Sequence, residues 1–316
     1  MKRFLLICIV LFGCSSPSTP LNEWMADTSK VRVLSTTPMI GDIVARIGKE
    51  RIQHTILIQG DLDPHSYELV KGDDEKLSLA EVIFYNGLGL EHGASLRYRL
   101  QKHPKAVGVG DWIRKTHPEE ILSKNAQVDP HVWMDVSLWA QIVDPIVSTL
   151  SEIDPEGAPF YEAHGKLVKE ELKQAHRELL LCFDRIPAAQ KYLVTSHDAF
   201  NYFARRYLNV NNDWETRVRA PEGLAPDGQL SCHDIQKIID YLCFYHITVV
   251  FPESNVSRDS LKKIVSACRE KGVRVRISNQ TLYADTLGPA EGDADTYLKM
   301  IQHNAKVLEK AWRTGE

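Results

Sequence analysis

The sequence predicts an α/β fold of two lobes joined by one long helix. Short apolar runs alternate with amphipathic runs in both halves of the chain, a pattern typical of parallel sheets covered by helices. Between the halves, from Pro159 to about Phe183, the chain is dense in Glu, Lys, Leu and Ala, and Gly165 is the one interruption. This segment predicts a continuous helix of roughly 25 residues, or about 37 Å at ~1.5 Å per residue.

The first lobe is predicted to cover residues 31–155, where each apolar run is followed by a helix-like run. Its predicted strands are Val31–Thr37, Ile52–Ile58, Val82–Tyr85 and Val107–Val109, and its predicted helices are Met39–Gly48, Glu75–Ala80, Leu88–Lys102 and Ser137–Leu150.

The linking helix is assigned to residues 156–186 and the second lobe to residues 187–316. The predicted strands of this lobe are Tyr192–Thr195, Thr248–Phe251 and Val273–Ile277, and its predicted helices are Phe200–Tyr207, Cys232–Tyr245, Ser257–Lys271 and Asp295–Trp312. The segment Asn209–Ser231 is rich in Asn, Asp, Pro and Gly, and we expect a long irregular loop there.

The N-terminus has the pattern of a secretory signal peptide over residues 1–13. Met1–Arg3 supplies positive charge, and the apolar run Phe4–Phe12 is far shorter than the ~20 residues that span a bilayer. The run ends in Leu-Phe-Gly-Cys, which resembles a bacterial lipobox and implies cleavage before Cys14 and lipidation of its sulfur. Residues 14–30, rich in Ser and Pro, then form a tether. The alternative is an ordinary cleaved signal with an incidental cysteine.

Charge and cysteine usage exclude several classes of protein. The formal net charge is -4 and no basic stripe is present, so nothing indicates nucleic-acid binding. The four cysteines beyond Cys14 form no CxxC motif, which argues against a cysteine zinc site or a thioredoxin-like motif; they are Cys182, Cys232, Cys243 and Cys268. Cys232 and Cys243 lie about 16 Å apart on one predicted helix, too far to bridge each other. The other pairings stay open.

Three histidines lie in loops near the ends of predicted strands. His65 and His131 each close an Asp-Pro-His triplet, and His197 directly follows the strand Tyr192–Thr195. In parallel α/β sheets, loops from different strands converge at the carboxyl ends of the strands. Proline stiffens both triplets, and imidazole is a good ligand for zinc, manganese and iron. Any one loop histidine can be a hydrogen-bonded surface residue, but together the three predict a shared metal site.

Several segments extend this pattern over almost the whole mature chain. They are DLDPHSYEL, the run Ala80–Glu91, DPHVWMD, TSHDAFNYFARRY, FPESNVS, LYADTLG and DTYLKMIQHN. The chain thereby resembles the cluster A-I solute-binding proteins of metal ABC importers, the ZnuA/TroA/PsaA-like group. This resemblance implies two Rossmann-like α/β lobes, one rigid backbone helix and a metal site in the interlobe cleft.

Carried over by position, the resemblance assigns three ligands to His65, His131 and His197 and the fourth to Asp285. The runner-up for the fourth place is Asp295, which is interpreted instead as a cap of the last helix. Glu253 matches an acidic residue near the cleft and is expected to contact a ligand histidine from outside the metal's own shell.

The expected cargo is one divalent transition-metal ion: zinc, manganese or iron. Related manganese binders often carry Glu where this chain has His197. The segment Trp112–Asp129 lacks the His- and acid-rich insertion of many zinc-dedicated members, although the affinity order at such sites favours zinc over manganese.

The expected function is capture of the ion outside the cytoplasm, in the periplasm or at the cell surface, and delivery to an ABC importer permease by a lipid-anchored monomer. We expect modest lobe closure and an affinity that falls as the pH drops through about 6. A metal-dependent hydrolase with a three-histidine site is one alternative, but HExxH, GxSxG and P-loop patterns are absent from the sequence. A surface adhesin lipoprotein is another.

Overall fold

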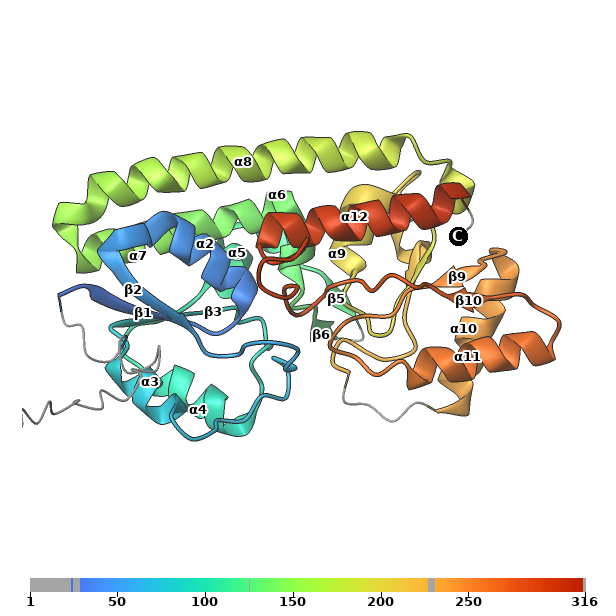
Figure 1. The fold of residues 1–316 in the computed structure, drawn as a ribbon, viewed down its shortest axis with the longest axis horizontal. Helices are drawn as coiled ribbons and strands as arrows, with labels where there is room; N and C mark the ends of the chain where they lie inside the picture. Colours follow the sequence, from blue (N-terminus) through green and yellow to red (C-terminus); the bar gives the residue numbers. More distant parts are fainter. Residues whose placement is uncertain (1–23, 25–28, 125, 227–230, 315–316) are drawn as a thin grey trace, which may run out of the picture.

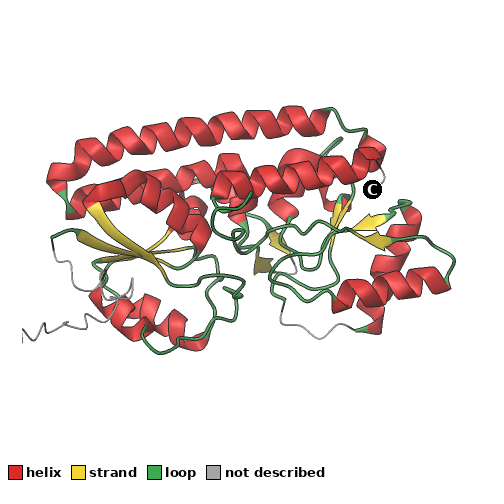
Figure 2. Cartoon of the chain, in the orientation of Figure 1, coloured by secondary structure: helices red, strands yellow, loops and turns green. Residues whose placement is uncertain are grey.

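The computed structural model describes residue 24 and residues 29–124, 126–226 and 231–314. The predicted signal peptide, most of the tether and Cys14 lie outside these residues. Two α/β halves lie side by side, and the helix α8 runs along both of them (Figure 1). Helices make up most of the structure, and the strands lie inside the two halves (Figure 2). Within the described residues, no helix is both long enough and apolar enough to cross a membrane.

The first half contains a parallel four-stranded sheet in the order β2-β1-β3-β4. Its strands and helices are β1 (Val31–Ser35), α2 (Pro38–Gly48), β2 (Ile52–Ile56), α3 (Asp73–Leu79), β3 (Val82–Tyr85), α4 (Ala94–Lys102), β4 (Ala106–Gly108) and α5 (Val109–Thr116). Alternate strand residues enter different cores: Val33 packs with α2, whereas Leu34 packs with α3 and α4. Successive side chains of a strand point to opposite faces, so the sheet is covered on both sides as predicted.

Short elements connect the strands and helices of both halves. They are η1 (Lys49–Arg51), η2 (Pro118–Glu120), β5 (Ser123–Lys124), β6 (Gln127–Val128), η3 (Val132–Met134), η4 (Ala140–Ile142), η5 (Pro155–Gly157), η6 (Ala188–Gln190), η7 (Ala204–Leu208) and η8 (Trp214–Thr216). The strands β5 and β6 form a small antiparallel hairpin.

The predicted helix over Ser137–Leu150 is divided in the structure. It consists of α6 (Val136–Trp139), the 3-10 turn η4 and α7 (Val143–Ile153). Pro145 lies in the first turn of α7, where its missing N–H costs no hydrogen bond. The prediction of one uninterrupted helix was therefore wrong, and this proline gives the physical reason.

The linking helix is continuous, as predicted. It is α8 (Ala158–Asp184), 27 residues long, and it packs against α2, α6, α7 and α12. Its buried side chains recur every three or four residues, which gives one apolar stripe along its length. At Gly165 an added Cβ would lie 2.5 Å from Val147 Cγ2, so this glycine allows α7 and α8 to approach closely.

The second half has much shorter strands than the sequence predicts. Its elements are β7 (Leu193–Val194), α9 (Asn201–Phe203), β8 (Val218–Arg219), α10 (Cys232–Phe244), β9 (Val249–Val250), α11 (Asp259–Glu270), β10 (Arg276–Ile277) and α12 (Tyr297–Thr314). β7 pairs with β8 and β9 with β10, both in parallel. The Phe251 N–H donates to the Val194 carbonyl at 2.8 Å and joins the two pairs.

Two further predictions for this half change in detail. The helix expected at Phe200–Tyr207 is only three residues of α-helix, α9, before it widens into the π-helix η7. The irregular segment contributes the strand β8, which pairs with β7. These changes place α9 and η7 against the loop that precedes α6, close to His131.

Candidate metal centre

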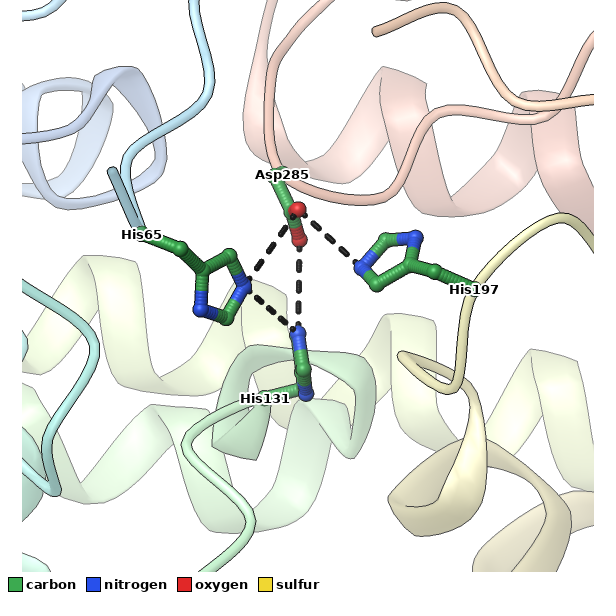
Figure 3. A group of neighbouring side chains, drawn as sticks. All are labelled: His65, His131, His197 and Asp285. Atoms are coloured by element: carbon green, nitrogen blue, oxygen red, sulfur yellow. Dashed lines mark hydrogen bonds and ion pairs between the residues drawn. The ribbon is translucent and has the colours of Figure 1, made fainter. Parts of the chain in front are cut away.

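Four side chains from four different loops converge on one point (Figure 3). His65 lies between β2 and α3, His131 directly precedes η3, His197 follows β7, and Asp285 lies between β10 and α12. Each residue is at most 2% exposed. One ligand atom from each lies within 4.8 Å of the other three. The structure thus brings together all four residues that the sequence analysis selected as ligands.

The distances between these atoms match a cage for a small cation. The Nε2 atoms of His65 and His131 are 3.3 Å apart, and His197 Nε2 is 3.1 Å from Asp285 Oδ2. The carboxylate oxygens of Asp285 are also 3.6 Å from the Nε2 atoms of His65 and of His131. Tetrahedral coordination with bonds of about 2.0–2.2 Å places neighbouring ligand atoms about 3.3–3.6 Å apart. The four distances in the structure, 3.1–3.6 Å, are close to that range.

Among the atoms of this group that face its centre, two are buried without a hydrogen-bond partner in the described structure. They are His197 Nε2 and Asp285 Oδ1. A buried polar atom without a partner costs about 1–3 kcal/mol. A cation at the centre of the group would accept electron pairs from both atoms, so the donor set fits a metal ion.

Two of the imidazoles contact a second carboxylate through the ring nitrogen that faces away from the centre. Asp129 Oδ1 is 2.7 Å from His131 Nδ1, and Glu253 Oε2 is 2.5 Å from His197 Nδ1. Glu253 Oε1 also accepts hydrogen bonds from the backbone N–H groups of Ser196 and His197. Such a carboxylate fixes the ring and leaves Nε2 facing a metal. The expected contact between Glu253 and a ligand histidine is therefore present.

The two Asp-Pro-His triplets are alike in sequence but use their aspartates differently. Asp129 accepts a hydrogen bond from the backbone N–H of His131 and also contacts its ring. Asp63 accepts from the backbone N–H groups of His65 and Ser66 and from the Ser66 hydroxyl. Asp63 thus stabilises the turn that carries His65, whereas Asp129 also orients an imidazole.

Hydrogen bonds on both sides of Asp285 fix its loop against the first half of the chain. The indole N–H of Trp133 donates to the Ala284 carbonyl at 2.8 Å. The hydroxyl of Thr286 donates to the Gly60 carbonyl at 2.6 Å. Both residues next to Asp285 are therefore hydrogen-bonded to the first half of the chain.

The loop of His131 is held to the second half in the same way. Asn201 Nδ2 donates to Asp129 Oδ2, and the Tyr202 hydroxyl donates to the Asp129 carbonyl, both at 2.9 Å. Lys124 forms an ion pair with Asp198, the residue after His197. These contacts explain why the two halves present their ligands at close distance.

The buried charges shift the pKa values of three members of the group in different directions. Burial lowers the pKa of His65 to about 3, although Asp285 opposes this shift. Burial also acts to lower the pKa of His197, but Glu253 and Asp285 together raise it well above its usual value. Burial acts to raise the pKa of Asp285, but the three histidines, His197 most of all, hold it far below its usual range. Without a metal, a proton on His197 thus balances the carboxylates.

Two residues near the centre differ from the sequence analysis. Asp295 is not part of the group; it lies just before α12 and pairs with Lys299 at 2.7 Å, and the Thr296 hydroxyl accepts from the Lys299 N–H. Asn255, which the sequence analysis did not select, donates to Asp285 Oδ2 at 3.3 Å. The sequence does contain a signal for Asn255, because this residue lies in FPESNVS, one of the segments that carry the family resemblance.

Comparisons with known proteins place the chain in one family. Residues 33–311 match the family model described as "Zinc-uptake complex component A periplasmic". The metal-binding protein YtgA of Chlamydia muridarum is 35% identical over 95% of this chain and 90% of its own length. The manganese-binding lipoprotein MntA of Bacillus subtilis is 32% identical over 98% of each chain.

Solved structures agree with this assignment. The Fe(III)-bound YtgA of Chlamydia trachomatis superposes with a TM-score of 0.85 at 35% identity, over 90% of this chain and 98% of that one. The periplasmic zinc-binding protein TroA of Treponema pallidum gives a TM-score of 0.82 at 28% identity, over 90% and 99%. The chain therefore belongs to the ZnuA family of extracytoplasmic solute-binding proteins, which are not enzymes and which bind transition metals for ABC importers.

Proposed function

We propose that His65, His131, His197 and Asp285 hold one divalent transition-metal ion, which the protein carries to its importer permease. The observation that supports this most strongly is the convergence of one buried ligand atom from each of the four residues. Three imidazoles and one carboxylate fill a tetrahedral shell, whereas catalytic zinc sites keep one position open for water. The ligand set thus favours carrying an ion over activating a water molecule.

The cargo that we propose is zinc, manganese or iron. Relatives with a similar chain are described as binding zinc, manganese or Fe(III), so the family fold accommodates several metals. Around the centre, Asp285, Asp129 and Glu253 supply three carboxylates to offset the charge of the ion. A given protein site generally binds zinc more tightly than iron or manganese. Competition among the three ions, followed by elemental analysis of protein purified from its host, identifies the cargo.

Metal and proton compete for His197. In the metal-free protein Glu253 and Asp285 raise the pKa of His197 and so favour the protonated form of the ring that lies between them. The stabilising effect of this proton is fully present below the unfolded pKa of about 6.5 and is lost as the pH rises through the higher folded pKa. A bound ion needs a neutral ring, so the proton must leave first.

We therefore predict that affinity for zinc rises about tenfold per pH unit between pH 6 and 7.5, because one proton leaves His197 on binding. His65, whose pKa is lowered, contributes no proton in this window. Competitive titration with a chelator at several pH values measures the slope. The replacement Glu253→Gln removes a carboxylate that raises the pKa of His197. The increase in zinc affinity should therefore occur at lower pH in this variant. Equal affinity at pH 5 and pH 7.5 contradicts the account.

We predict that His65→Ala and His197→Ala each weaken zinc binding by at least about a hundredfold, since loss of a mere supporting contact already costs about 10–100-fold. Equilibrium titration gives the affinities, and circular dichroism shows whether the fold is retained. His117→Ala is the matched control because, in the described structure, the His117 side chain hydrogen-bonds only to the neighbouring Thr116. Unchanged affinity in His65→Ala would show that the ligands are misassigned.

We propose further that the protein acts as a monomer anchored by lipid at Cys14. The support is the lipobox-like sequence together with relatives described as lipoproteins, such as MntA of Bacillus subtilis and the metal ABC transporter substrate-binding lipoprotein SsaB of Streptococcus sanguinis. A lipid anchor keeps the carrier at the membrane that holds the permease.

For this anchor we predict that Cys14→Ser moves the protein from the membrane fraction to the soluble extracytoplasmic fraction of a bacterial host. A single lipid chain gives only marginal membrane binding, so the effect depends on the full lipid modification. Cell fractionation with immunoblotting measures the distribution, and Cys182→Ser is the control. Identical fractionation of Cys14→Ser and the unmodified chain would exclude the anchor.

A further inference from the structure

A fifth histidine, His92, lies next to the metal centre and outside the ligand group. Its ring centroid is 5.8 Å from that of His65, at an interplanar angle of 55°. The other imidazoles next to His65 are those of His131 and His197, at 5.2 and 6.1 Å, and both are completely buried. His92 is partly exposed. It is thus the imidazole that continues the cluster from His65 toward solvent.

The backbone holds His92 in this place. Its N–H donates to the Leu90 carbonyl at 2.9 Å, and its Nδ1 lies 3.4 Å from the Gly89 carbonyl. The preceding residue, Glu91, is buried and accepts hydrogen bonds from the Thr36 hydroxyl and from the backbone N–H groups of Asn86 and Gly87. With Nδ1 turned toward a carbonyl, Nε2 is the nitrogen left for a metal or a water molecule.

The segment of His92 is also fixed to the loop that carries His65. At Gly93 an added Cβ would lie 2.0 Å from the Tyr67 carbonyl oxygen, so the two backbones are in direct contact. Glu68 accepts hydrogen bonds from the N–H groups of Ala94 and Ser95 at 2.7 and 2.9 Å. One backbone contact and the Glu68 side chain therefore hold the segment of His92 against the loop of His65.

An ion that enters this centre must exchange its water shell for ligands that are at most 2% exposed. Exchange in steps is easier than exchange at once, since each new ligand replaces one water before the next is lost. A partly exposed imidazole beside the first buried one offers such a step. His92 offers an imidazole nitrogen as a metal ligand, and its neighbour is His65, a residue of the metal centre.

We propose that His92 is a transfer ligand, which takes a divalent ion from solvent through Nε2 and passes it to His65. This inference rests on the proposed function of the four-residue centre. His92 is not a ligand of the stored ion, since it is not among the residues that share the centre. A group that binds the ion only in passage lowers the barrier in both directions. Its loss therefore slows loading and release alike and leaves the equilibrium affinity nearly unchanged.

The test is stopped-flow mixing of the full mature chain with Zn²⁺ at pH 7.5, followed through tryptophan fluorescence. Trp133 is a suitable reporter because its ring lies 5.2 Å from that of His131. Release is measured by mixing the loaded protein with excess EDTA. The variants are His92→Gln, His92→Ala and His92→Cys, which restores a zinc ligand, and His117→Gln is the control. Thermal unfolding of each variant reports on the fold.

We expect both rate constants to fall on the order of tenfold in His92→Gln and His92→Ala, a loss comparable with that of other supporting residues around metal sites. The dissociation constant should stay within about twofold, and His92→Cys should recover part of the rate. Unchanged loading in His92→Gln overturns the proposal, and so does faster release with weaker affinity, which marks a permanent ligand or a structural support. Absence of zinc binding in the unmodified chain would instead refute the proposed function.

Discussion

The structure depends on the buried ligand atoms of His65, His131, His197 and Asp285, four pairs of which lie 3.1–3.6 Å apart. Polar groups so deeply buried are tolerated only when they are paired or when they bind a cation. In the metal-free protein a proton on His197 meets part of this requirement, and an ion meets it completely. The need to compensate buried charge thus links the fold of the site to its function.

The surrounding protein limits how far the ligands can separate. The continuous helix α8 lies along both halves of the molecule (Figure 1). The helix α12 lies along the second half and packs against α8 and against α2 of the first half. Nearer the centre, Trp133 and Thr286 hold the loop of Asp285, and Asn201 holds Asp129. We therefore expect release of an ion to involve small rearrangements of loops rather than wide opening about a flexible hinge.

Much of this arrangement could be predicted from sequence because its signals are local. A proline before each of two histidines, a post-strand histidine and a dense helical segment all act within a few residues of the feature they specify. The role of Asp129 could not be predicted, because Asp63 in an identical triplet bonds to backbone and serine instead. The two-residue strands of the second half and the π-helix of Ala204–Leu208 result from tertiary packing, which overrides local propensity. The division before Pro145 has a local signal too, because proline is favoured in the first turn of a helix and not in its interior.

X-ray absorption spectroscopy of the protein loaded with one equivalent of zinc identifies the atoms that coordinate the ion. We predict three imidazole nitrogens and one or two carboxylate oxygens at about 2.0–2.2 Å, with no sulfur in the shell. A sulfur scatterer at about 2.3 Å, or fewer than three imidazoles, would contradict it.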